Sequence, residues 1–199
     1  MNRMIYLIRH GEPDFGPAGP VCLGRMDLPL SEKGKEQAKV LAKYFSSIDV
    51  TTVYHSPLTR CRQTAELLSL GPRAVIAVNG LEEVDMGKWD GLAFDEIKLR
   101  YPDLYEHRGI DPDKIAPTDG ESLEAAGNRF SISFYELIRA SDGDIAVIAH
   151  AGVNKMLLGA LLNLDGRQSV KLPQPYCCLN RLEWDGSRLN VISVGETVS

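Results

Sequence analysis

The sequence predicts an α/β fold, a three-layer α/β/α sandwich around a mostly parallel mixed sheet. Short apolar runs rich in strand-forming residues alternate along the chain with segments whose apolar residues recur at helical spacing. This alternation is typical of parallel strands joined by helices. The last two apolar runs flank Asp185-Gly186, which is typical of an antiparallel hairpin, so the sheet is expected to be mixed.

The first half of the chain is expected to hold three strands and two helices. Ser31 and Ser56 are residue types that cap helix N-termini, and Pro57 is favoured at a first helical position. The run before Arg9-His10 is apolar and short, as a buried strand would be. We expect strands at 4–8, 51–54 and 73–78, a loop at 12–30, and helices beginning at Ser31 and at Ser56-Pro57, the second ending near Leu70 before Gly71-Pro72.

In the second half, the run Ile145–Ala149 is the clearest buried strand and ends at His150. Residues 81–120 contain several Gly and Pro and are expected to be irregular or to form short helices, as an insertion over one edge of the domain. The whole chain, 1–199, is expected to be one domain. The other elements expected are helices at 121–140 and 151–164 and hairpin strands at 179–184 and 189–194.

Composition narrows the class of protein. The 199 residues carry a formal net charge of -5, with a sequence pI of about 5.4. A general nucleic-acid surface needs a basic balance, so nucleic acid is not expected as a partner. No stretch approaches the roughly 20 apolar residues of a membrane span. The cysteines lack zinc-site spacing and a disulfide framework, so we expect free thiols and a cytoplasmic location. They are Cys22, Cys61, Cys177 and Cys178.

Two strands end in the same way, with an apolar run followed by a histidine and a small residue. In open α/β sheets ligands bind beyond the carboxyl ends of the strands, so His10 and His150 are expected to meet there. Arg9 precedes the first histidine. Arg60 lies in the first turn of the predicted second helix, where a cation is unfavourable for the helix dipole unless an anion lies nearby. Arginines bind phosphate through two parallel hydrogen bonds, so a phosphate pocket is predicted.

The motifs resemble those of the histidine phosphatase family, also called the phosphoglycerate mutase-like family. Six blocks occur in the family's order over most of the chain, and this agreement is far more specific than Arg-His-Gly alone. The blocks are Arg9-His10-Gly11-Glu12; Gly24 to Ser31 with Gly34 and Gln37-Ala38; Ser56 to Arg60 with Thr64-Ala65; Leu81 to Gly87 with Trp89 and Gly91; Gly120-Glu121-Ser122; and His150-Ala151-Gly152.

The resemblance implies a phosphoglycerate mutase-like fold and a covalent mechanism. His10 would be the nucleophile that forms a phosphohistidine, and nearby arginines are expected to lower its pKa. Glu83, four residues before Gly87, is a better match than Glu82 for the proton donor to the leaving group. No metal or cofactor is implied. The residues implied to bind phosphate or substrate are Arg9, Arg60, His150, Gly11, Gly24 and Ala151.

The sequence departs from the family at two positions. Gly16 stands where many members have Asn, and Cys61 stands where Ala is usual. Specificity is expected to lie in the insertion at about 92–120, which would cover the pocket mouth. Its candidate residues are Tyr101, Tyr105, His107 and Arg108.

Three functions remain open at this point. The first is a phosphatase for a small phosphorylated metabolite, similar in sequence to α-ribazole phosphatase and its broad-specificity relatives. The second is a cofactor-dependent phosphoglycerate mutase, although Arg100 and Arg108 do not form the adjacent pair that the mutases carry. The third is a non-catalytic phosphate-binding module. The oligomeric state is open, with a homodimer as one option.

Overall fold

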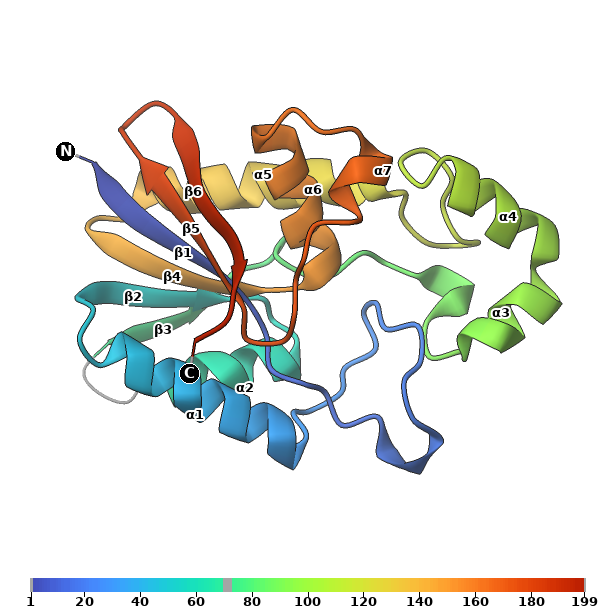
Figure 1. The fold of residues 1–199 in the computed structure, drawn as a ribbon, viewed down its shortest axis with the longest axis horizontal. Coiled ribbons are helices and arrows are strands. Elements are labelled where there is room, and N and C mark those ends of the chain that lie inside the picture. The colour runs from blue at the N-terminus through green and yellow to red at the C-terminus, as the bar shows by residue number, and fades with distance from the viewer. Residues whose placement is uncertain (1, 70–72, 199) are drawn as a thin grey trace.

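A computed structural model describes residues 2–69 and 73–198 of the chain. Its centre is a six-stranded sheet with the order β3-β2-β4-β1-β5-β6 (Figure 1). Strands β3, β2, β4 and β1 pair in parallel with their neighbours in this order. β5 pairs antiparallel with β1, and β6 pairs antiparallel with β5. The predicted mixed sheet is confirmed. The strands are β1 (Arg3–Arg9), β2 (Val50–His55), β3 (Ala74–Ala77), β4 (Asp144–Ala149), β5 (Leu179–Trp184) and β6 (Leu189–Glu196).

Helices cover both faces of the sheet and complete the three expected layers (Figure 1). α1 and α2 pack on one face, and α5 and α6 pack on the other. Parallel strands need crossover connections, which α1, α2 and α5 supply. The helices are α1 (Glu32–Phe45), α2 (Thr59–Leu68), α3 (Phe94–Arg100), α4 (Pro102–Ile110), α5 (Leu123–Ala140), α6 (Ala151–Leu161) and α7 (Gly166–Ser169).

The central strand β1 fills both layers because side chains alternate across a strand. Ile5 and Leu7 belong to the cluster under α5 and α6, and Tyr6 and Ile8 belong to the cluster under α1 and α2. Burying each aliphatic side chain contributes about 1.5–3 kcal/mol. This anchoring fixes the end of the strand, and therefore the position at which His10 leaves the sheet.

The start of α2 corrects the prediction for Ser56 and Pro57. The helix begins at Thr59 and not at Pro57. Its cap comes from a distant segment, because the Asp27 carboxylate accepts hydrogen bonds from the Thr59 backbone N–H (2.6 Å) and hydroxyl (2.7 Å). The Ser56 hydroxyl contacts the His150 imidazole. Local sequence signals do not reveal a cap supplied from so far along the chain.

Most other predicted elements occur within a few residues of the expected bounds. The helix predicted for 151–164 ends early, because α6 ends at Leu161, and the short α7 begins only at Gly166, beyond the predicted range. The loop predicted for 12–30 contains a single 3₁₀ turn at Gly16–Ala18. Gly71-Pro72, predicted to end the second helix, lies outside the described residues.

Helices α3 and α4 lie at one end of the molecule, beyond the sheet (right of Figure 1). The buried Trp89 ring anchors them, with ring centroids of Tyr101 and Tyr105 at 6.4 and 6.0 Å. The Arg108 guanidinium lies 5.9 Å from the same indole ring. These aromatic and cation–π contacts pack α3 and α4 against Trp89. Trp89 belongs to the fourth of the family-like blocks, whose acid-bearing loop, residues 81–87, contains Glu83.

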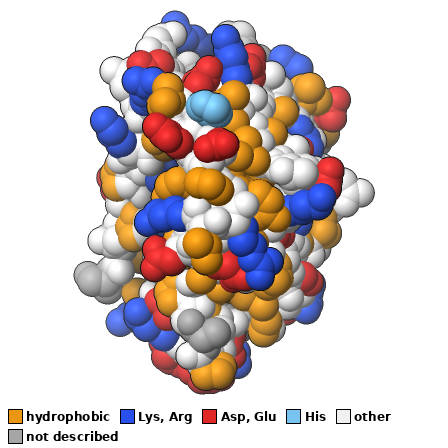
Figure 2. All heavy atoms as spheres, turned by 90° about the vertical axis from the view of Figure 1, so that its right-hand side faces the viewer, with side chains coloured by type: hydrophobic (Ala, Val, Ile, Leu, Met, Phe, Trp, Pro, Cys, Tyr) orange, Lys and Arg blue, Asp and Glu red, His pale blue; other side chains and the backbone are white. Residues whose placement is uncertain are grey.

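Figure 2 shows this end of the molecule from outside. Lys and Arg side chains are interspersed there with Asp, Glu and hydrophobic side chains. Within residues 2–69 and 73–198, no helix is both long and apolar enough to cross a membrane.

Gly34→Ala is expected to destabilise the fold by about 1–3 kcal/mol through overpacking. A Cβ at Gly34 would lie 2.1 Å from the carbonyl oxygen of Glu12, a backbone atom in the loop that follows His10. Gly109 in α4 is the matched control, because a Cβ there meets no atom within 4 Å. Gly109→Ala should be neutral or stabilising by up to about 1 kcal/mol. Urea midpoints measure both changes, and equal midpoints for the two variants would contradict this packing.

Candidate active site

The two histidines that end strands meet at the carboxyl edge of the sheet, as predicted. β1 and β4 are parallel neighbours, and the His10 backbone N–H donates to the Ala149 carbonyl (3.0 Å). The imidazole rings of His10 and His150 therefore lie side by side, with centroids 5.0 Å apart and planes at 65°. Both side chains are buried.

The two ring nitrogens of His10 have different partners. Nδ1 lies 2.7 Å from the Gly11 carbonyl oxygen, which can only accept, so Nδ1 carries the proton. Nε2 is then the unprotonated nitrogen, and it accepts a hydrogen bond from Nε of Arg60 (3.3 Å). The ring is thus held in one tautomer with its lone pair directed at the arginine.

Burial is the main cause that lowers the pKa of His10 well below its usual value of 6.5, and the Arg60 and Arg9 guanidiniums lower it further. Burial likewise lowers the pKa of His150, followed by the effects of Arg60 and His10. The predicted direction is confirmed for His10, although desolvation exceeds the arginines as its cause. Both imidazoles are neutral near pH 7.

Arg60 is fully buried near the start of α2. Its Nη1 donates to the Met26 carbonyl (2.8 Å) and its Nη2 to the Gly24 carbonyl (2.7 Å). In the part of the chain that the structure describes, no carboxylate forms an ion pair with it. A buried cation without a counter-charge is costly, so this position is complementary to an anion.

His150 is held by two groups from the α2 region. Its Nε2 lies 2.8 Å from the Ser56 hydroxyl and 3.4 Å from the Cys61 sulfur. Burial raises the pKa of the Cys61 thiol above its usual value. Cys61 is therefore a small buried residue, as predicted from its place in the sequence, and not a thiolate nucleophile.

Arg9 is positioned by a loop near the C-terminus that the sequence did not indicate. Its Nη1 donates to the Gln174 carbonyl, and its guanidinium carbon lies 3.8 Å from the centre of the Tyr176 ring. The Tyr176 ring is also 5.9 Å from the His10 ring. The buried Gln174 side chain donates in turn to Asn180 of β5 (2.6 Å). Buried, fully bonded amides of this kind fix a loop in one conformation.

Glu83, and not Glu82, lies beside the helix that follows His150. A Cβ at Gly152 would be 2.4 Å from Glu83 Oε1, so glycine leaves the space that the carboxylate needs. Glu82 instead accepts from the Gly80 backbone N–H (2.7 Å). The Glu83 carboxylate accepts from the backbone N–H groups of Gly152 (2.9 Å), Val153 (3.1 Å) and Val84 (2.9 Å).

An ion pair supports the loop that carries Glu83. Arg129 of α5 binds both carboxylate oxygens of Glu121, each at 2.8 Å. Arg129 also donates to the carbonyls of Gly80, Glu82 and Glu83. Glu121 belongs to a block that resembles the family, whereas Arg129 was missed because no local motif marks it.

Gly11, Gly24 and Ala151 were also expected to bind phosphate or substrate. The Gly11 amide donates to the Thr64 hydroxyl (3.1 Å), and the Gly24 amide donates to the Asp90 carboxylate (2.7 Å). A phosphate contact from either amide would require breaking that bond. Ala151 opens α6 directly after His150.

The insertion residues expected to set specificity are engaged mainly in packing. Tyr101 and Tyr105 contact Trp89, and Arg108 is buried and donates to the Ile115 carbonyl. His107 is exposed. A role for any of them in substrate choice stays a prediction.

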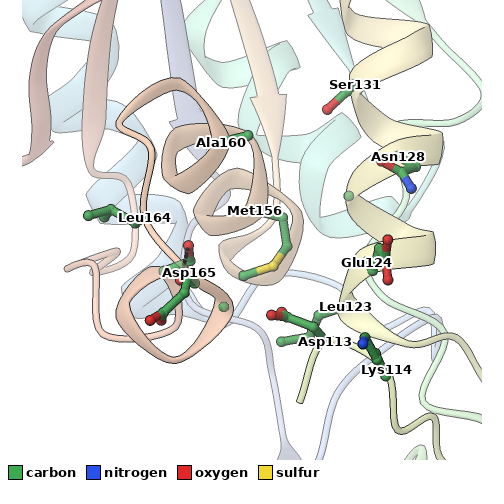
Figure 3. A pocket seen from close by; sticks show the side chains of 13 residues that line it. Asp113, Lys114, Leu123, Glu124, Asn128, Ser131, Met156, Ala160, Leu164 and Asp165 are labelled. Atoms are coloured by element: carbon green, nitrogen blue, oxygen red, sulfur yellow. Dashed lines mark hydrogen bonds between the residues drawn. The ribbon is translucent and has the colours of Figure 1, made fainter. Parts of the chain in front are cut away.

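A separate pocket of about 380 Å³ lies between α5, α6 and α7 (Figure 3). Its charged lining consists of Asp113, Glu124, Asp165 and Lys114. This acidic balance disfavours a phosphate. The pocket is distinct from the arginine-lined site because neither Arg9 nor Arg60 lines it. Among the described residues, no group of three or more His, Cys, Asp or Glu is placed to hold a metal ion.

A pair of neutral histidines lies beside a buried arginine that has no carboxylate partner among the described residues, at the carboxyl edge of a mixed sheet, and this arrangement is complementary to a bound anion. The sequence matches the histidine phosphatase superfamily (branch 1) over residues 5–197. The chain therefore belongs to this family, and the fold expected from the resemblance is confirmed.

Individual relatives agree with this assignment. The chain is similar to phosphoserine phosphatase 1 of Hydrogenobacter thermophilus, with 33% identity over 164 residues that cover 81% of this chain and 77% of that protein. The solved structure of Bacillus stearothermophilus YhfR has a TM-score of 0.90 at 28% identity, covering 99% and 98% of the two chains. A putative alpha-ribazole-5'-P phosphatase from Escherichia coli has a TM-score of 0.88, covering 99% and 98%, and its 22% identity shows likeness of fold.

The buried histidines predict how stability depends on pH. In the unfolded chain each imidazole binds a proton below about pH 6.5. In the folded chain the pKa values of His10 and His150 are lower, so unfolding takes up protons in this range. The unfolding free energy should therefore fall as the pH drops below about 6.5, by up to about 1.4 kcal/mol per pH unit for each histidine, until the folded pKa is reached.

His150→Gln is expected to abolish the proton uptake of residue 150 on unfolding, and so to weaken the dependence of the unfolding free energy on pH. Its urea unfolding free energy should change less between about pH 6.5 and 5.5 than that of the wild type, by up to about 1.4 kcal/mol. His107→Gln is the control because His107 is exposed, and it should keep the wild-type slope. Identical slopes in all three proteins would show that His150 is not held neutral by the fold.

Proposed function

We propose that this phosphatase is a metal-independent phosphomonoester hydrolase that acts on a small phosphorylated metabolite through a phosphohistidine at His10. The observation that carries the proposal is the contact between the buried Arg60 guanidinium, unpaired with any described carboxylate, and the unprotonated Nε2 of His10. A phosphate bound to Arg60 would replace this hydrogen bond and bring its phosphorus next to the freed lone pair. Such positioning and charge stabilisation supply most of the catalysis in phosphoryl transfer.

In the first displacement, Nε2 of His10 forms a bond to phosphorus while the ester P–O bond breaks. The electron pair of that bond goes to the alcohol oxygen, which takes a proton from the Glu83 carboxyl group. Arg9, Arg60 and His150 would bind the phosphoryl oxygens during transfer. The hydrogen bond from Nδ1 to the Gly11 carbonyl supports this step, because it stabilises the ring as its other nitrogen becomes bonded.

In the second displacement, water attacks the phosphohistidine. The Glu83 carboxylate takes a proton from the water as its oxygen bonds to phosphorus, and the N–P bond breaks. The products are inorganic phosphate and neutral His10, so the site returns to its starting state. The position of the Glu83 carboxylate at the start of α6, the helix that follows His150, supports its assignment as the acid of this site.

A mutase is the alternative, and its second acceptor would be a hydroxyl of a bound substrate. The phosphoglycerate mutases carry an adjacent arginine pair for the substrate carboxylate. Here Arg108 is buried against Trp89 and bonded to a backbone carbonyl, and Arg100 pairs with Glu96 of its own helix. The similarity to a phosphoserine phosphatase also favours water as the acceptor.

Wild-type protein is expected to hydrolyse p-nitrophenyl phosphate in the presence of EDTA, and His10→Ala should lose at least about a thousandfold in kcat. The control is Ile132→Ala, because Ile132 is 61% exposed on α5 and lies outside both the site and the insertion. It should retain wild-type turnover. Activity that survives in His10→Ala would overturn the covalent mechanism, and transfer between positions of phosphoglycerate would favour the mutase.

Glu83→Gln tests the proton donor by comparing leaving groups. A nitrophenolate departs without a proton, whereas an alkoxide needs one. In kcat/KM, which reports the first displacement, the variant should lose about 10²–10⁴-fold for an alkyl phosphate such as phosphoserine and much less for p-nitrophenyl phosphate. An equal loss for both substrates would argue against general-acid catalysis by Glu83.

A further inference from the structure

We infer that Asp90 is a positioning residue that fixes the place of Arg60, acting through the backbone of residues 24–26. The inference rests on the proposed function for its consequence, since Arg60 is the arginine proposed to bind phosphate. That Asp90 sets the position of the Arg60 guanidinium is inferred from the contacts of the described residues alone.

The Asp90 carboxylate and the Arg60 guanidinium both bind the backbone of the same two residues, Gly24 and Met26. Asp90 Oδ1 accepts from the Gly24 backbone N–H and Oδ2 accepts from the Met26 backbone N–H, both at 2.7 Å. The carbonyls of these same residues accept from the Arg60 Nη2 and Nη1 atoms at 2.7 and 2.8 Å. Asp90 therefore reaches the arginine in two hydrogen-bonded steps without touching it.

This arrangement suits an arginine that must stay free to bind an anion. A direct carboxylate partner would neutralise Arg60 and compete with phosphate. Here the Asp90 carboxylate holds the backbone of Gly24 and Met26 in place, and the carbonyl oxygens of these two residues face the buried cation. Each Nη nitrogen still has a second N–H, so the guanidinium keeps donors for a phosphate.

Further contacts hold the residues on either side of the 24–26 segment. The Cys22 backbone N–H donates to the Leu92 carbonyl (2.9 Å), and the Gly91 N–H donates to the Cys22 carbonyl (2.8 Å). The next residue, Asp27, caps the helix that carries Arg60. One short stretch of chain thus holds Arg60 both by its guanidinium and by the start of its helix.

The segment also touches the loop that carries Glu83. A Cβ at Gly24 would lie 2.6 Å from the Val84 carbonyl oxygen, so glycine allows the two segments to meet. Asp90 therefore binds a segment that contacts both Arg60 and the acid-bearing loop. Its loss should displace the guanidinium while the sheet and its covering helices remain in place.

The test uses the full-length Asp90→Asn protein, in which the amide replaces one acceptor oxygen by a donor that faces a backbone N–H. Asp95→Asn is the matched control, because the Asp95 side chain is 98% exposed on α3. Binding of inorganic phosphate is measured by calorimetry. Asp90→Asn should weaken it about tenfold or more, as expected for disturbing hydrogen bonds to a charged group, and Asp95→Asn should leave it unchanged.

A second readout is the NMR resonance of the Arg60 Nε–H, which lies against His10. It reports the place of Arg60 whether or not the protein turns over substrate, so a failure of the proposed function and a failure of this inference are distinguishable. The resonance should shift in Asp90→Asn without phosphate. Should Asp90→Asn not fold, Asp90→Glu keeps the charge, and its longer side chain should shift the same resonance. A folded variant at position 90 with wild-type phosphate affinity and an unshifted Arg60 resonance would overturn the inference.

Discussion

The candidate site depends on the burial of one guanidinium without a carboxylate partner among the described residues. Arg60 has no exposed surface, and its hydrogen bonds go to two carbonyls and an imidazole. Desolvating a cation in this way is tolerated only where its donors are bonded and an anion can complete the site. Burial is the main cause that lowers the pKa of His10, and the same cation lowers it further and binds the lone pair of its Nε2. The geometry of the His10 ring and part of its electrostatics therefore follow from how Arg60 is held.

Local sequence patterns predicted the framework of this arrangement. An apolar run that ends in His10 and another that ends in His150 are strong signals, because adjacent parallel strands bring their carboxyl ends together. The place of Arg60 in a first helical turn was also informative, since an isolated helix disfavours a cation there. Order and spacing of the motifs then separated Glu83 from Glu82, which composition alone could not do.

The supporting contacts could not be predicted in the same way. Asp27 caps a helix that begins 32 residues later, and Asp90 holds a segment 64–66 residues earlier in the chain. Gln174 and Tyr176 lie on an irregular loop near the C-terminus, yet they contact Arg9 at the end of the first strand. Such pairs join segments with no shared periodicity, so only the folded chain brings them together. The error in the predicted start of α2 has the same origin. Ser56 is a residue type that commonly caps helices, but in this fold its hydroxyl contacts His150.

The proposed mechanism requires the neutral Nε2 of His10 beside Arg60 to become covalently phosphorylated. Rapid quenching of the full-length protein during turnover under alkaline conditions, which preserve phosphohistidine, followed by mass spectrometry of its peptides, tests this most directly. Phosphate is expected on the peptide that contains His10, and mild acid treatment should remove it. Phosphate on another residue, or turnover with no phosphorylated peptide at any quench time and none by phosphorus NMR, would contradict it.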